Sequence, residues 1–302
     1  MIGTGIGYSM FIINPYIYGV PYAYLLDDYS GATAAYSLRH LRSAYSGALI
    51  RIRRSSDSAE KDFYPDSNNE LSLNSEDGAG TSLSTWISTN DGFVVTWYDQ
   101  ANSNDITQST AANQASIVTS GVVNTKNGKP STLYDGTNDY LTRANLTALN
   151  AYPFSVFGVG SNEDSAELAP IVSQRNITGD YSGCSMFLDR TATAIGFSID
   201  QGASNALFNY PSQLNNNSQR IQSFCITSGG DGELWLNGTS QETISGVSSY
   251  ATSLTANLNI GKQDVGPLDS LMHIQEVIIY NSDETSNQSG IETNINDHYS
   301  AF

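Results

Sequence analysis

Short runs with the residue pattern of β-strands, separated by turn residues, recur along this chain from residue 93 to residue 280. Examples are Phe93–Tyr98, Ser116–Ser120, Phe154–Gly160, Ala194–Asp200, Ile221–Thr227, Leu254–Gly261 and His273–Tyr280. Closely spaced short strands with turn signals between them are typical of a β-sandwich or a barrel. The sequence therefore predicts an all-β fold with few helices.

The strongest local signal is a hairpin in the last third of the chain. Alternating residues at Glu233–Leu236 and Thr239–Ile244 flank the dipeptide Asn237-Gly238. Both Asn and Gly tolerate the positive φ that a two-residue hairpin turn requires. We therefore expect two antiparallel strands joined at this dipeptide.

One segment near the N-terminus has a helical pattern. Its apolar residues recur at three- and four-residue spacing, at Ala34, Leu38, Leu41 and Tyr45. We expect an amphipathic helix over residues 32–46. Apolar and charged residues then alternate at Leu49–Arg53, which predicts a half-buried strand.

A second helix is expected at the C-terminus. The strand Ile274–Tyr280 precedes Ser282, a residue type that caps helices. Asp283 and Glu284 follow, where acidic side chains favour the positive end of a helix dipole. The prediction is a helix over residues 283–299.

The composition restricts the partners of this chain. Its 302 residues carry a net charge of −17, which disfavours non-specific binding to nucleic acid or to an anionic membrane. The basic residues gather in one stretch that contains Arg39, Arg42, Arg51, Arg53, Arg54 and Lys61. We interpret this stretch as a solvated or ion-paired face, with a functional basic patch as the alternative.

No metal or cofactor site is predicted. Cys184 and Cys225 each lie in an expected strand, which favours buried free thiols over a disulfide. The three histidines, His40, His273 and His298, are far apart in the sequence and lack the spacing of metal ligands.

The first 26 residues are apolar and aromatic and are interrupted by Gly and Pro. They lack the basic start of a signal peptide and the unbroken apolar run of a membrane span. We predict an extended arm (1–26) that precedes one β-sandwich domain (27–302). The arm residues expected to mediate assembly are Met10, Phe11, Ile12, Ile13, Tyr16 and Tyr18.

Two motifs resemble known families. The stretch AAYSLRHLRSAYSGALIRIRRSSDSAEKD at residues 34–62, together with FVVTWYDQANSNDITQSTAANQ at 93–114, resembles the first third of the catalytic domain of the α-L-arabinofuranosidase B family of glycoside hydrolases. The element Tyr134–Leu141 resembles the FDGxxDYL motif of concanavalin A-like, laminin-G-like jelly rolls. Residues 274–299 also resemble the last strand and the exit helix of those domains. The resemblance implies a jelly-roll β-sandwich over roughly residues 30–300.

The family's catalytic positions are changed in this sequence. The nucleophile of that family is a Glu in a Gly-His-Met-Glu context, and the matching stretch Gly183–Phe187 has Met186 at that position. The general acid is an Asp after an Ile-Gly-Gly turn. Here Ile260-Gly261-Lys262 is followed by Gln263, with Asp264 one position late, and the family's adjacent Cys-Cys pair is missing. The resemblance therefore implies a protein without that catalytic machinery. Other carboxylate pairs, Asp180 with Asp189 or Glu163 with Asp164, are interpreted as chance in an acidic chain.

Several residues remain candidates for ligand binding. Trp86 and Trp235 could stack on sugar rings, with core packing as the alternative. Asp135 and Asp139 could bind calcium in a jelly-roll loop, although a tight turn with Tyr140 in the core is favoured. In the WYDQ motif, Trp97 is expected in the core and Asp99 and Gln100 on the backbone of their own turn.

The same pattern, as it occurs in bacteriophage and environmental virus structural proteins, implies a non-enzymatic virion protein. In this interpretation a capsid-decoration, head-fibre or tail-fibre component displays a lectin-like domain, which could attach to host-surface glycans. The arm would join it to other virion proteins or to sister chains, with a trimer favoured. The alternative is a secreted α-L-arabinofuranosidase-like hydrolase.

Overall fold

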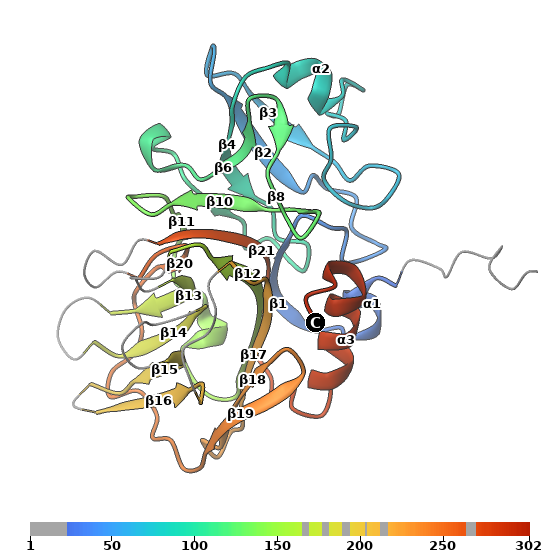
Figure 1. The fold of residues 1–302 in the computed structure, drawn as a ribbon. Coiled ribbons are helices and arrows are strands. Elements are labelled where there is room, and N and C mark those ends of the chain that lie inside the picture. Colours follow the sequence, from blue (N-terminus) through green and yellow to red (C-terminus); the bar gives the residue numbers. More distant parts are fainter. Residues whose placement is uncertain are drawn as a thin grey trace, which may run out of the picture.

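The computed structural model describes residues 23–164, 169–176, 181–188, 194–202, 204–211, 217–263 and 270–302. Two β-sheets face each other, and the C-terminal helix α3 (Gln288–Tyr299) covers the outer side of one of them (Figure 1). Further strands extend this arrangement into an upper part. Among the described residues, no helix is both long enough and apolar enough to span a membrane.

The sheet next to α3 is called the central sheet. Its longest strand, β21 (Leu271–Tyr280), pairs antiparallel with β12 (Phe154–Asn162). The sheet continues through β17 (Arg220–Ile226), β18 (Gly232–Leu236) and β19 (Thr239–Ile244). On its other edge β21 pairs with β1 (Ala32–Ser37) and, nearer its start, with β10 (Thr132–Asp135).

The opposite sheet is called the lateral sheet. In spatial order it contains β5 (Ile106–Thr107), β11 (Leu141–Arg143), β20 (Leu258–Ile260), β13 (Pro170–Arg175), β14 (Gly183–Phe187), β15 (Ile195–Asp200) and β16 (Asn205–Asn209). All of these pairs are antiparallel, as in a jelly-roll sandwich.

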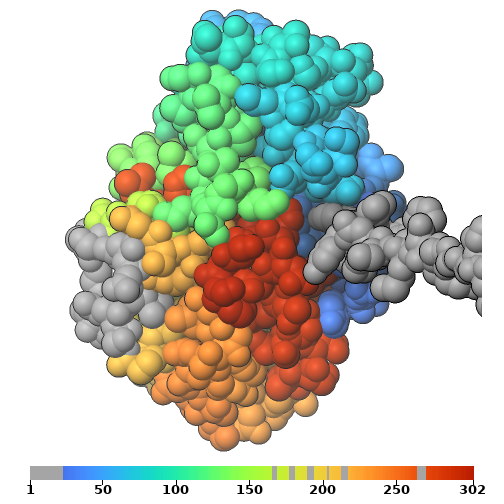
Figure 2. Space-filling model, turned by 45° about the vertical axis from the view of Figure 1, so that its right-hand side comes forward, coloured from blue at the N-terminus to red at the C-terminus, as the bar shows by residue number. Residues whose placement is uncertain are grey.

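The upper part continues from β10 through β6 (Ser116–Thr119), β4 (Gly92–Trp97), β2 (Ile50–Arg54) and β3 (Glu60–Phe63). Smaller elements are α1 (Leu25–Asp28), α2 (Leu83–Ile87), β7 (Val122–Val123), β8 (Thr125–Lys126), β9 (Lys129–Pro130) and single 3-10 turns at Ala111–Asn113 and Thr147–Leu149. In Figure 2 the red C-terminal segment lies between this upper part and the orange β18–β19 hairpin.

Two hydrophobic cores hold the layers together. The main core lies between the two sheets, where Phe224 stacks on Phe197 with ring centroids 3.8 Å apart. The second core lies between the central sheet and α3, and includes Ile291 and Ile295 of the helix. Strands of the central sheet supply both cores; in β12, Val156 belongs to the main core and Phe157 to the second. Such strands are therefore buried on both faces.

The expected helix over residues 32–46 is wrong. This segment starts with β1, which pairs with β21, and continues as an irregular loop. Ala34 and Tyr36 belong to the main core and Ala35 belongs to the second core, so β1 is buried on both faces. Apolar and polar residues therefore do not alternate along it as they do in a half-buried strand. Its apolar spacing therefore resembled that of a helix.

The other strand predictions agree better with the structure. The hairpin at Asn237-Gly238 is confirmed, with φ of 49° and 74° at the two turn residues. The strand at Leu49–Arg53 is confirmed as β2, with Ile50 and Ile52 fully buried. The C-terminal helix is confirmed but shorter than expected. It begins at Gln288, since Ser282 donates to the Glu284 carboxylate and does not cap it.

The predicted arm falls largely outside the described residues, including its assembly residues from Met10 to Tyr18. Its last two apolar residues are described. Leu25 and Leu26 lie in α1, are buried and belong to the second core with α3. This end of the predicted arm therefore packs on the domain.

Both cysteines are free and buried, as predicted. Most of the basic stretch is also ion-paired as expected, with Arg51 bound to Glu60 and Asp62, Arg54 to Asp57, and Lys61 to Asp77. Arg39 differs, because it forms a buried ion pair with Glu276 of β21.

Candidate functional site

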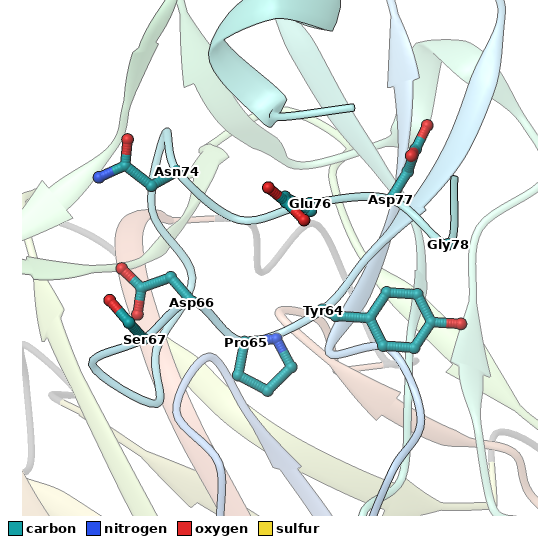
Figure 3. Close-up of a pocket in the computed structure, with 8 residues that line it drawn as sticks. All are labelled: Tyr64, Pro65, Asp66, Ser67, Asn74, Glu76, Asp77 and Gly78. Carbon is teal, nitrogen blue, oxygen red and sulfur yellow. The ribbon is translucent and has the colours of Figure 1, made fainter. Parts of the chain in front are cut away.

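A pocket of about 450 Å³ opens in the loop between β3 and α2, and we call it the loop pocket (Figure 3). It is lined by Tyr64, Pro65, Asp66, Ser67, Asn74, Glu76, Asp77 and Gly78. All of these residues come from the stretch at residues 64–81, which is rich in Ser, Asn, Asp and Gly. Its many turn-forming residues indicated a loop but did not indicate that the loop encloses a pocket.

Two aspartates shape this loop. One carboxylate oxygen of Asp66 accepts the N–H groups of Asn68 and Glu70, and the other accepts the Ser72 hydroxyl. Asp77 accepts the N–H groups of Ala79 and Thr81 and an ion pair from Lys61. Asx turns of this kind stabilise irregular backbone.

The same contacts keep the Asp77 carboxylate ionised. The hydrogen bond from Lys61 and the backbone N–H of Thr81 lower the pKa of Asp77 to about 2. Asp77 therefore stays ionised at any physiological pH, and its side chain serves the loop itself.

The loop is anchored at a distance from the pocket. Leu71 donates its N–H to the carbonyl of Leu38, and His40 donates its N–H to the carbonyl of Asn69. Glu70 accepts an ion pair from Lys129, with 2.9 Å between the charged atoms. The pocket therefore sits on a backbone that is tied to two other parts of the chain.

Four other polar side chains of the pocket make no hydrogen bonds that shape the loop. The described residues give no hydrogen-bond partner to the Tyr64 hydroxyl, the Ser67 hydroxyl, the Asn74 amide or the Glu76 carboxylate. Ser67, Asn74 and Glu76 are exposed, and Tyr64 is half-buried. The pocket thus combines an aromatic ring and a Pro ring with polar groups that can both donate and accept.

A second polar region crosses the lateral sheet. Polar residues face one another in register on neighbouring strands, in the order Thr142, Asn259, Ser173, Ser185 and Ser198. The Ser173 and Ser185 hydroxyls are 2.8 Å apart, and Gln263 donates its amide to Ser185. Beside this row, Arg175 and Asp200 form an ion pair across Gly183, which has no side chain to separate them.

The bond between Gln263 and Ser185 joins the two segments to which the family resemblance assigned catalytic residues. Gln263 follows Ile260-Gly261-Lys262, and Ser185 lies in Gly183–Phe187. Met186, at the nucleophile position of the resemblance, is fully buried in the main core on the other side of β14. Asp264, Asp180 and Asp189 lie outside the described residues.

The pair Glu163 and Asp164 is described. The Glu163 carboxylate accepts an ion pair from Lys126 at 2.6 Å and a hydrogen bond from Ser161. Glu163 is therefore committed to contacts within the chain.

The two tryptophans proposed for sugar stacking are in the cores. Trp86 is 6% exposed and packs against Phe63 in the main core, while Trp235 is 7% exposed and belongs to the second core. Neither offers a free ring face, so the alternative of core packing is correct for both. Trp86 is further covered by Arg54, whose guanidinium lies 4.9 Å from the indole centre.

Asp135 and Asp139 form a turn, as the favoured alternative predicted. Asp135 accepts the N–H of Thr137, and Asp139 accepts the N–H of Asp135. Tyr140 is only half-buried beneath Lys262, whereas Tyr134 is the residue of this motif that fills the core. Over the described ranges, no group of three or more His, Cys, Asp or Glu side chains could hold a metal ion.

The WYDQ motif acts on more than its own turn. Trp97 is fully buried in the main core, as expected. Asp99 accepts N–H groups from its own turn and also from Ala35 of β1. Gln100 binds the irregular segment after β1, since it accepts the N–H of Leu41 and donates to the carbonyl of Arg39. The motif thus satisfies backbone groups that a helix over residues 32–46 would have satisfied internally.

Neither protein-family models nor curated proteins match this chain. Solved structures do match it. A GH54 α-L-arabinofuranosidase soaked with a cyclic sulfate inhibitor superimposes with a TM-score of 0.63 and 16% identity. An arabinofuranosidase complexed with arabinofuranosyl-α-1,2-xylobiose superimposes with a TM-score of 0.60 and 17% identity. Each match covers 90% of this chain and 64% of the other.

At these identities the similarity establishes a shared β-sandwich fold, as the sequence predicted. This chain spans about 64% of the length of those arabinofuranosidase chains. The structural similarity and the sequence resemblance therefore indicate the same architecture.

Proposed function

We propose that this chain is a non-catalytic carbohydrate-binding protein, and that the loop pocket binds the sugar. The observation that carries the proposal is the set of unpartnered polar groups in the lining of the loop pocket, which also contains the Tyr64 ring. Sugars offer hydroxyl groups that need donors and acceptors and an apolar C–H face that packs on aromatic rings. Tyr64 supplies the ring, and Ser67, Asn74 and Glu76 supply the polar contacts.

An array of immobilised glycans, probed with the labelled full-length chain, tests this proposal. Replacing Tyr64 by Ala should weaken binding to the strongest glycan about tenfold, which corresponds to about 1.4 kcal/mol. Replacing Glu76 by Gln keeps the side-chain shape and should also weaken binding, because a carboxylate accepts stronger hydrogen bonds than an amide.

Tyr181→Ala is the matched control, since Tyr181 is an exposed tyrosine beside Arg175 and outside the loop pocket. It should bind as the wild type does. A wild-type chain that binds no glycan, or a loss of binding in the control equal to that in Tyr64→Ala, would reject the loop pocket as the site.

The non-catalytic part of the proposal rests on Met186. A glycosidase needs two carboxyl groups that flank the scissile bond, and a thioether in the core cannot replace one. A second candidate function, an α-L-arabinofuranosidase-like hydrolase, is favoured by the fold similarity. Incubation with 4-nitrophenyl α-L-arabinofuranoside separates the two, because our proposal expects no release of nitrophenol above a blank without protein.

In this proposed role the chain is a virion component that displays the sandwich outward. Residues 1–22 would fix it to other virion proteins or to sister chains, most simply as a trimer. The apolar composition of that segment supports this role, because burying such side chains is worth about 25 cal/mol per Å². Analytical ultracentrifugation of the full chain should show an oligomer that is lost when residues 1–22 are removed; a monomer in both cases would contradict it.

A further inference from the structure

A second pocket, of about 250 Å³, lies far from the loop pocket in the sequence. It is lined by residues 150–152 and 249–253, and we call it the tyrosine pocket because Tyr152 and Tyr250 are its two rings. Neither the sequence motifs nor the fold similarity points to it.

The two rings are held in fixed positions. Their centroids are 5.8 Å apart with an interplanar angle of 62°. The Tyr152 hydroxyl donates to the carbonyl of Ser248 at 2.9 Å, and the Tyr152 ring also contacts Phe154 at the edge of the main core. Because core packing fixes these rings, the entropic cost of ordering them when a ligand stacks on them is small.

Small and hydroxyl-bearing residues complete the pocket. Ser249 and Ser253 are exposed, and their hydroxyls have no hydrogen-bond partner among the residues that the structure describes. Ala151 and Ala251 are exposed beside the two tyrosines and leave room for a ligand to approach the rings. The Asn150 side chain is held by Asn145 and Gln174, so the rim next to it is rigid.

Among the residues that the structure describes, no charged side chain lines the tyrosine pocket. Burial raises the pKa of Tyr152 and of Tyr250 above the usual value, so both phenols remain neutral at physiological pH. The loop pocket, by contrast, has the carboxylates of Asp66, Glu76 and Asp77 in its lining. A neutral ligand therefore suits the tyrosine pocket.

The geometry points to a second carbohydrate site in the tyrosine pocket, which takes one neutral sugar ring independently of the loop pocket. The volume is below the 300–1,000 Å³ of sites for drug-sized ligands and fits a single ring. The C–H face of the sugar would lie against Tyr152 or Tyr250, and its hydroxyls would bind Ser249 and Ser253. Two sites on one chain would also raise the avidity for a polysaccharide that reaches both.

Saturation-transfer NMR on the full-length chain tests this inference. The probes are D-galactose, D-glucose, D-xylose and L-arabinose as neutral sugars and N-acetylneuraminic acid as an anionic one. Measurements are made in a Tyr64→Ala/Glu76→Gln background, in which the loop pocket is disabled. We expect at least one neutral sugar to retain its signal there, and the anionic sugar to give none.

Ala251→Arg then fills the tyrosine pocket from an exposed position, so the cores are untouched. It should reduce the remaining signal about fivefold or more. The matched control, Ala44→Arg, adds the same side chain at an exposed alanine of another loop and should change nothing. Equal signals from the two arginine variants, or equal binding of N-acetylneuraminic acid and the neutral sugars, would overturn the inference.

The two proposed sites can fail separately. If Ala251→Arg removes binding and Tyr64→Ala/Glu76→Gln does not, the tyrosine pocket is the only one of the two sites supported. If the double variant alone already abolishes every sugar signal, the tyrosine pocket is rejected and the loop pocket stands.

Discussion

Replacing Arg39 by Met is expected to lower the free energy of unfolding by about 3–5 kcal/mol, as for other buried ion pairs that lose one partner. Arg39 is 2% exposed and its partner Glu276 is 1% exposed. The guanidinium donates to both carboxylate oxygens, at 2.8 and 3.0 Å. Methionine fills similar volume but leaves the Glu276 charge buried without its counter-charge.

The expected loss of stability is large because the buried Glu276 carboxylate cannot reach solvent. It lies on β21, the strand that joins the central sheet to the upper part, and it also accepts the hydroxyls of Ser37 and Tyr299. These two neutral donors remain in the variant but do not compensate a full negative charge in a medium of low dielectric constant. Urea unfolding followed by tryptophan fluorescence measures the difference.

Arg51→Met is the matched control. Arg51 pairs with Glu60 and Asp62 on the surface, where its side chain is 37% exposed, and its loss should cost less than about 1 kcal/mol. The double variant Arg39→Met/Glu276→Gln removes both charges and should recover part of the loss. If Arg39→Met is no more destabilising than Arg51→Met, the ion pair does not stabilise the fold as argued.

Arg39 also illustrates how far the sequence could predict contacts. Arg51, Arg54 and Lys61 have acidic partners nearby in the sequence, so an ion-paired face was a correct prediction for them. The partner of Arg39 is 237 residues away, in a strand brought beside β1 by the sheet. No local pattern marks such a pair, which depends on the order of strands.

The same contrast holds for the secondary structure. The turn at Asn237-Gly238 was predictable because a positive φ is a property of two neighbouring residues. The strand β1 was missed because its pattern comes from burial between two cores. Strand pairing with β21 decided its structure against a local helical pattern.

The candidate sites were the least predictable part. Trp86 and Trp235 were candidates because aromatic rings bind sugars, but large aromatic side chains more often serve the cores, as both do here. Tyr64 and Tyr250 line pockets because loops bend around them, and loop geometry depends on contacts such as those of Asp66 and Asp77. Residue type alone could not separate the tyrosines in pockets from those in the core, such as Tyr134 and Tyr280.

Replacing Asp99 by Ala is expected to lower the free energy of unfolding by about 3 kcal/mol or more. Its carboxylate is 1% exposed and accepts four backbone N–H groups, from Ala35, Ala101, Asn102 and Asn104, at 2.7–3.1 Å. Each buried N–H group left without its acceptor lowers stability by about 1–3 kcal/mol. Water that enters the space left by the carboxylate would satisfy only some of these four N–H groups. The N–H of Ala35 matters most, because it belongs to β1, the strand whose structure the local pattern did not predict.

Two variants check this interpretation of Asp99. Asp99→Asn keeps one acceptor oxygen and should lose about half as much stability as Asp99→Ala. Asp135→Ala removes a similar turn-forming carboxylate, which accepts the N–H groups of Thr137 and Asn138, from an exposed position and should cost less than about 1 kcal/mol. Equal losses in Asp99→Ala and Asp135→Ala, measured by urea unfolding, would mean that Asp99 only shapes its own turn. A larger loss at Asp99 would support the conclusion that its buried hydrogen bonds, which include the one from the N–H of Ala35 in β1, stabilise the fold.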